Sequence, residues 1–128
     1  MDQGYTSRML EHFRNPRNTG EVADADGVGE VGNPACGDLM KITIRVDGGR
    51  LAEVKWRTLG CGAAIATSSA MTELATGRTL EDALALTREQ VAEALGGLPK
   101  EKMHCSNLAA DGLRAAIRDY LAKRGEGS

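Results

Sequence analysis

Residues 40–58 read MKITIRVDGGRLAEVKWRT, in which apolar side chains alternate with charged or polar ones on both sides of Asp47-Gly48-Gly49. Such alternation is typical of a strand that buries one face, and Asp-Gly is a favoured hairpin turn. The stretch therefore predicts an antiparallel hairpin whose strands span residues 40–46 and 51–58.

Helical patterns occur before and after this hairpin. A short helix is expected to end at Asn15-Pro16, because the residue before a proline is pushed out of the helical region. The small side chains of residues 63–76 predict a helix that can lie close against a sheet. Further helices are expected to begin at Thr79, Thr87 and Ser106. We therefore expect an α+β fold, with a small antiparallel sheet of about three strands and helices packed on one face.

Length and composition limit the classes of protein to which the chain can belong. Its 128 residues suit a single domain, which we expect to span residues 1–124, followed by a flexible tail over residues 125–128. No apolar run approaches the roughly 18 residues of a membrane helix, and the first residues lack the features of a signal peptide. We therefore expect a cytoplasmic protein with no membrane partner.

Nucleic acid is not an expected partner either. Sixteen basic residues stand against 18 acidic ones, for a net charge of −2, and only 3% of the residues are aromatic. A protein that binds nucleic acid needs an excess of basic residues or several exposed rings on which bases can stack.

The glycine-rich stretch of residues 17–38 is expected to be mobile, because it is polar and poor in apolar anchors. Within it, residues 27–32 read GVGEVG and match the spacing of a dinucleotide-binding loop. That loop works only between a buried strand and a helix, and neither pattern flanks these residues. We therefore interpret them as a plain glycine-rich loop or an edge strand.

The three cysteines, Cys36, Cys61 and Cys105, are the candidate reactive groups. Their odd number and wide spacing do not suit a disulfide framework or a zinc finger. Each lies where a loop meets a predicted strand or helix, and a helix N-terminus favours a thiolate. For any one cysteine alone, the simpler interpretation is a small buried side chain with no chemical role. That all three lie at such junctions argues against this interpretation.

Other candidate ligands lie near the cysteines. Asp38 and His104 are each within two residues of a cysteine, and Lys102 could offset the charge of the thiolates. His12 has no such neighbours and is expected at the surface. Thiolates suit zinc, copper(I) or an iron–sulfur cluster, and a Cys–His nucleophilic enzyme also stays open. The residues alone therefore predict a three-thiol metal or sulfur site.

The chain resembles the U-type iron–sulfur cluster assembly scaffolds, the IscU and NifU N-terminal family. Four motifs carry the resemblance: HFRNPRN (12–18), PACGD (34–38), TLGCGAAIATSS (58–69) and KMHCS (102–106). The resemblance implies a small α+β domain. It also implies that the three cysteines, Asp38 and His104 are ligands of a transient 2Fe–2S cluster, with Asp38 keeping the cluster labile. Cys105 would accept persulfide sulfur beside Lys102, and zinc would fill the site when no cluster is bound.

The family's activity implies a scaffold, not an enzyme, that binds iron. It would receive sulfur from a cysteine desulfurase and pass the cluster to acceptor apoproteins, with a frataxin-like iron or regulatory protein as a further partner. Residues 98–102 read LPKEK and lack part of the family's chaperone-recognition stretch, so hand-off through Hsp70 and J-type chaperones is not implied. The alternatives are a zinc-bound sulfur acceptor of the SufU kind, against which His104 argues, and a Cys–His hydrolase.

Overall fold

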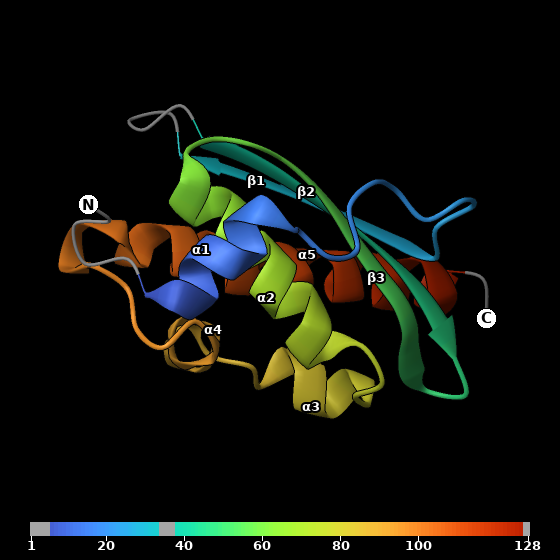
Figure 1. Cartoon of the computed structure of the whole chain (residues 1–128). Coiled ribbons are helices and arrows are strands. Elements are labelled where there is room, and N and C mark those ends of the chain that lie inside the picture. Colours follow the sequence, from blue (N-terminus) through green and yellow to red (C-terminus); the bar gives the residue numbers. More distant parts are fainter. Residues whose placement is uncertain (1–5, 34–37, 127–128) are drawn as a thin grey trace.

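The computed structural model describes residues 6–33 and 38–126. Figure 1 shows the arrangement of the helices and strands. In chain order these are α1 (Ser7–Arg14), β1 (Gly27–Asn33), β2 (Asp38–Asp47), β3 (Arg50–Leu59), α2 (Gly62–Ala75), α3 (Leu80–Leu84), α4 (Arg88–Ala94), a 3-10 turn (Lys100–Lys102) and α5 (Met103–Glu126). Within these residues, no helix is long and apolar enough to cross a membrane.

The three strands form one antiparallel sheet in the order β1-β2-β3. The predicted hairpin is confirmed as β2 and β3. Ile42 lies opposite Trp56 and Ile44 opposite Val54, and all four side chains are buried. The alternate side chains of both strands lie on the outer face, where all but Thr43, which bonds to the backbone N–H of Val22 and is buried, are at least partly exposed.

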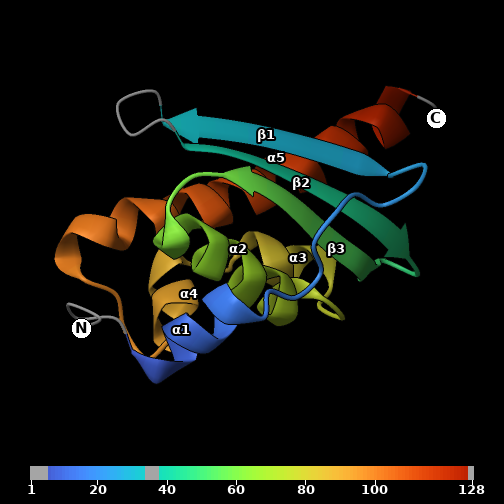
Figure 2. The same cartoon turned by 45° about the horizontal axis from the view of Figure 1, so that its top comes forward.

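The helices cover the inner face of the sheet. α5 packs against β1 and β2, α2 packs against β3, and α1 and α4 contact these two helices from outside. Figure 2 shows this helical layer on one side of the three strands. The predicted α+β class is therefore confirmed.

Two short helices begin as predicted. The Thr79 hydroxyl accepts a hydrogen bond from the backbone N–H of Asp82, and Thr87 forms a complete capping box with Gln90. The last helix differs from the prediction, because it begins at Met103 rather than Ser106. The 3-10 turn ends at Lys102, and α5 follows it without a break.

The glycine-rich stretch contains a strand and backbone hydrogen bonds to the sheet, and its mobility stays a prediction. Residues 27–33 form edge strand β1, and the preceding segment is fastened to the sheet. The backbone N–H of Trp56 donates to the carbonyl of Asn18 at 3.0 Å, and the N–H of Gly20 donates to the Trp56 carbonyl at 2.9 Å. Val22 is buried and supplies an apolar anchor. The remaining part of the stretch, residues 34–37, lies outside the described residues.

The glycines of the GVGEVG sequence have a packing role. A Cβ atom on Gly27 would overlap the carbonyl oxygen of Ala116 in α5, and one on Gly29 would overlap that of Gly112. These glycines therefore let the helix lie directly on the strand. The next element in the described residues is strand β2, whereas a dinucleotide-binding loop requires a helix, so the edge-strand interpretation holds.

Candidate functional site

Two of the three cysteines meet where α2 and α5 begin. Cys61 is the N-cap residue of α2, directly after β3, and its side chain is partly buried. Cys105 lies in the first turn of α5 and is fully buried. Both pack against one apolar cluster that includes Ala64 and Leu95. In Figures 1 and 2 the first turns of α2 and α5 lie at the same end of the molecule.

Lys102 and His104 lie beside these sulfur atoms. The Lys102 ammonium is 3.9 Å from the Cys61 Sγ, so a positive charge adjoins one thiol. The Nδ1 of His104 is 3.1 Å from the carbonyl oxygen of Glu101, and its Nε2 is 3.5 Å from the Cys105 Sγ. Because a carbonyl only accepts, Nδ1 carries the proton and Nε2 of the neutral ring keeps a lone pair. The ring thus presents a potential ligand atom next to a thiol.

The structure places the other two predicted ligands less completely. Cys36 lies outside the described residues. Asp38 is the first residue of β2, and its neighbour Leu39 lies opposite Leu59, two residues before Cys61. The backbone therefore begins β2 beside the corner between β3 and α2. Across residues 6–33 and 38–126, no three His, Cys, Asp or Glu side chains are arranged to hold a metal ion.

Comparison with known families identifies the family of the chain. A family model, "NifU-like N terminal domain", matches residues 4–127, nearly the whole chain. The chain belongs to the NifU-like N-terminal domain family. The resemblance inferred from the four motifs is thereby confirmed.

Named members of this family are close in sequence. The chain is 62% identical over 122 residues to "Iron-sulfur cluster assembly scaffold protein IscU 1" of Archaeoglobus fulgidus, covering 95% of this chain and 80% of that protein. It is 48% identical over 125 residues to "Iron-sulfur cluster assembly scaffold protein IscU" of Haemophilus influenzae, covering 94% of this chain and 98% of that protein.

A solved structure shares the fold. The crystal structure of the N-terminal part of a nitrogen-fixing NifU-like protein from Brucella abortus superposes with a TM-score of 0.80. The superposition covers 95% of this chain and 97% of that one at 21% sequence identity. This likeness supports the arrangement of strands and helices in the NifU-like domain.

The position predicted for His12 is wrong, because the side chain is buried between α1 and α2. Its Nδ1 is 2.8 Å from the hydroxyl of Ser69, and its Nε2 is 3.4 Å from the carboxylate of Glu73. Ser69 also accepts the backbone N–H of Arg17 at 2.9 Å. In the neutral ring, Ser69 donates to Nδ1 and Nε2–H points to Glu73, so every group is satisfied.

We expect the burial of His12 to make folding of the NifU-like domain sensitive to pH. Burial lowers the pKa of His12 below its ordinary value, although the nearby Glu73 carboxylate opposes the effect. The unfolded chain therefore binds a proton more readily, and stability falls as the pH drops through the ordinary imidazole pKa of about 6.5. We expect the urea midpoint to decrease between about pH 7.5 and about pH 5.5, and His12→Gln to reduce that decrease.

The chain's only other histidine provides the control for that measurement. His104→Gln makes the same exchange outside the Ser69–Glu73 network, so a loss of pH dependence specific to His12→Gln assigns the effect to that network. An equal pH dependence in His12→Gln and the unmodified protein would show that another group is responsible.

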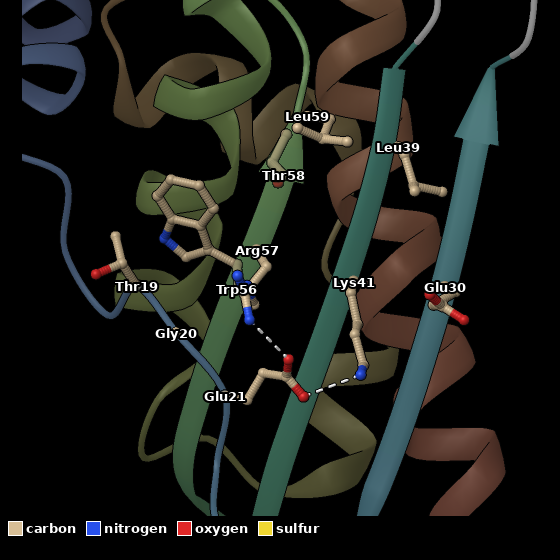
Figure 3. A pocket seen from close by; sticks show the side chains of 10 residues that line it. All are labelled: Thr19, Gly20, Glu21, Glu30, Leu39, Lys41, Trp56, Arg57, Thr58 and Leu59. Atoms are coloured by element: carbon tan, nitrogen blue, oxygen red, sulfur yellow. Dashed lines mark hydrogen bonds and ion pairs between the residues drawn. The ribbon is translucent and has the colours of Figure 1, made fainter.

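A groove of about 610 Å³ opens on the outer face of the sheet beside the Cys61 corner. Figure 3 shows Leu39 and Leu59 at one end of it, and both are exposed. At the other end, the Glu21 carboxylate accepts hydrogen bonds from Lys41 at 2.9 Å and Arg57 at 3.2 Å. The Lys41 bond is the main reason that the pKa of Glu21 is lowered. The one carboxylate pairs with both cations, and the end of the groove that carries Leu39 and Leu59 is apolar.

Proposed function

We propose that this NifU-like domain is a scaffold on which an iron–sulfur cluster is assembled and from which the cluster passes to acceptor proteins. The observation that supports the proposal most is that Cys61 lies beside Lys102, Cys105 lies beside His104, and both cysteines pack against one apolar cluster. Soft thiolate and imidazole donors suit iron in a cluster, and a nearby ammonium offsets the negative charge that thiolates and sulfide bring. The names of the relatives agree with this role.

The proposed cargo is a 2Fe–2S cluster held by residues drawn from Cys36, Asp38, Cys61, His104 and Cys105. Each iron of such a cluster takes two protein ligands, so four of these five residues complete the set. Zinc, which takes four tetrahedral ligands of the same kinds, would occupy the site when no cluster is present. Cys36 and Asp38 are included in this set because of the PACGD motif at residues 34–38.

Sulfur is proposed to arrive as a persulfide from a cysteine desulfurase. The Cys105 thiolate would attack the outer sulfur of the donor persulfide, forming a new S–S bond while the donor cysteine leaves as a thiolate. Lys102 would stabilise the charged groups. Because Cys105 is fully buried, its neighbours must move before the donor can reach it.

The proposed role is that of a carrier, not of an enzyme, in the cytoplasm and within a single domain. Its partners would be the desulfurase, acceptor apoproteins and a frataxin-like protein. The second candidate is a zinc-bound sulfur acceptor of the SufU kind, for which a thiol-rich site would also serve. The lone pair of His104 Nε2 beside Cys105 favours the scaffold.

Cluster transfer tests this proposal. We expect the reconstituted protein to pass iron and sulfide together to a separately purified apo-ferredoxin in the presence of a chelator, because an intact cluster does not equilibrate with free iron. Protein that yields its iron to the chelator and leaves the acceptor empty would contradict the scaffold role.

Asp38→Ala tests the proposed weak corner of the site. An oxygen donor binds iron less firmly than a thiolate does, so Asp38 is the ligand expected to dissociate first. When Asp38 is removed and His104 binds the iron in its place, the cluster should be lost roughly tenfold more slowly. The measurement is the decay of the visible absorption band after a chelator is added. Glu30→Ala removes a carboxylate from the neighbouring strand and should decay like the unmodified protein. Faster decay of Asp38→Ala would contradict the role given to Asp38.

A further inference from the structure

Three consecutive residues of α2, Thr67, Ser68 and Ser69, carry hydroxyl groups and are fully buried. Buried polar groups need hydrogen-bond partners, and consecutive helical residues point in different directions. Each of the three therefore reaches a different part of the molecule. Ser69 is hydrogen-bonded to His12, whereas Thr67 and Ser68 contact the two segments that contain Cys105 and Cys61.

Thr67 connects α2 to the first turn of α5. Its hydroxyl lies 2.9 Å from the carbonyl oxygen of Ala63 and 3.1 Å from that of Ala64 in its own helix. It also lies 3.3 Å from the backbone carbonyl oxygen of Cys105. The hydroxyl has one proton for these three carbonyls, and the carbonyl of Cys105, a cysteine of the site, is the most distant of them.

Ser68 connects α2 to the end of β3. Its hydroxyl donates to the carbonyl of Ala64 at 2.8 Å, which uses its only proton. The hydroxyl of Thr58, also 2.8 Å away, must therefore be the donor in the bond between the two side chains. Thr58 precedes Cys61 by three residues, so this bond joins the end of β3 to α2 on either side of Cys61.

We propose that Thr67 and Ser68 are positioning residues that set the placement of Cys61 relative to Cys105. Helix α2 begins directly after Cys61, and two of its neighbouring hydroxyls contact Thr58, at the corner before Cys61, and the backbone of Cys105. The inference rests on the proposed function, because it concerns the same site. Such supporting contacts typically change metal affinity by about 10- to 100-fold when they are lost.

The test is a Co²⁺ titration of the full chain under anaerobic conditions. The sulfur-to-cobalt charge-transfer band and the d–d bands report the number of thiolates and the tetrahedral geometry at the metal. Thr67→Val, which keeps the shape but removes the hydroxyl, is expected to bind Co²⁺ about tenfold more weakly with altered d–d bands. Ser68→Ala should do the same, and Thr67→Ser, which keeps the hydroxyl, should restore both properties.

Thr72→Val is the matched control for this titration. Thr72 is equally buried in α2 and donates to a carbonyl of its own helix, but its other bond is to Asn18 instead of a segment that bears a cysteine. We expect this variant to lower the unfolding midpoint and to leave Co²⁺ affinity and spectrum unchanged. If Thr67→Val does not fold by circular dichroism, Ser68→Ala and Thr67→Ala are compared with the same control.

The outcomes separate the two proposals. If the unmodified protein shows no thiolate–cobalt band, the proposed site fails, and the positioning role fails with it. If the unmodified protein binds Co²⁺ but Thr67→Val and Ser68→Ala match Thr72→Val in affinity and spectrum, the positioning role alone is overturned.

Discussion

Cys61→Ser is expected to lose its reconstituted cluster at least about 100-fold faster than the unmodified protein. A serine hydroxyl stays protonated at neutral pH, so it cannot replace a thiolate, and one iron loses a firm ligand. Cys61 is also the ligand candidate next to the Lys102 ammonium, at the N-cap of α2. The measurement is the decay of the visible band after a chelator is added.

Ala94→Ser is the control for this substitution. Ala94 packs against the same apolar cluster as Cys61, so the variant adds a hydroxyl there without removing a thiol. We expect it to retain the cluster like the unmodified protein. Equal cluster lifetimes in Cys61→Ser and Ala94→Ser would contradict the assignment of Cys61 as a ligand.

Gly29→Ala is expected to reduce the free energy of unfolding by about 3 kcal/mol. The added methyl group would overlap the Gly112 carbonyl and the side chain of Ala115, so α5 must move away from β1. The contacts that α5 makes with β2 would be disturbed as well. Urea unfolding followed by circular dichroism measures the change.

Glu30→Ala is the control for the glycine variant. Glu30 follows Gly29 in β1, but its side chain is exposed on the outer face, away from α5. We expect its unfolding free energy to lie within about 0.5 kcal/mol of that of the unmodified protein. A similarly small loss in Gly29→Ala would show that the helix does not need a glycine at this position.

Local patterns predicted much of the fold. The alternation of Ile42 and Ile44 with polar residues identified the hairpin, and Thr79 and Thr87 marked two helix starts. These features depend on residues within a few positions of one another. Residues 27–32 could be interpreted only as a loop or an edge strand, because the packing role of Gly29 appears only when α5, more than 80 residues later, lies against it.

The candidate site was predicted in part for the same reason. Junction positions pointed to the cysteines, but the full burial of Cys105 and its bond to Thr67 depend on how α2 meets α5. His12 was misplaced because its partner Ser69 lies 57 positions away. The run of buried hydroxyls in α2 could have signalled that polar partners were needed.

Anaerobic reconstitution with ferrous iron and sulfide tests the central claim most directly. After removal of unbound ions, the account predicts a coloured protein with a visible charge-transfer band and equal amounts of iron and acid-labile sulfide. It also predicts that prior loading with Zn²⁺ delays the band, because both would use the same ligands. A colourless protein that retains zinc and takes up no sulfide would contradict the account.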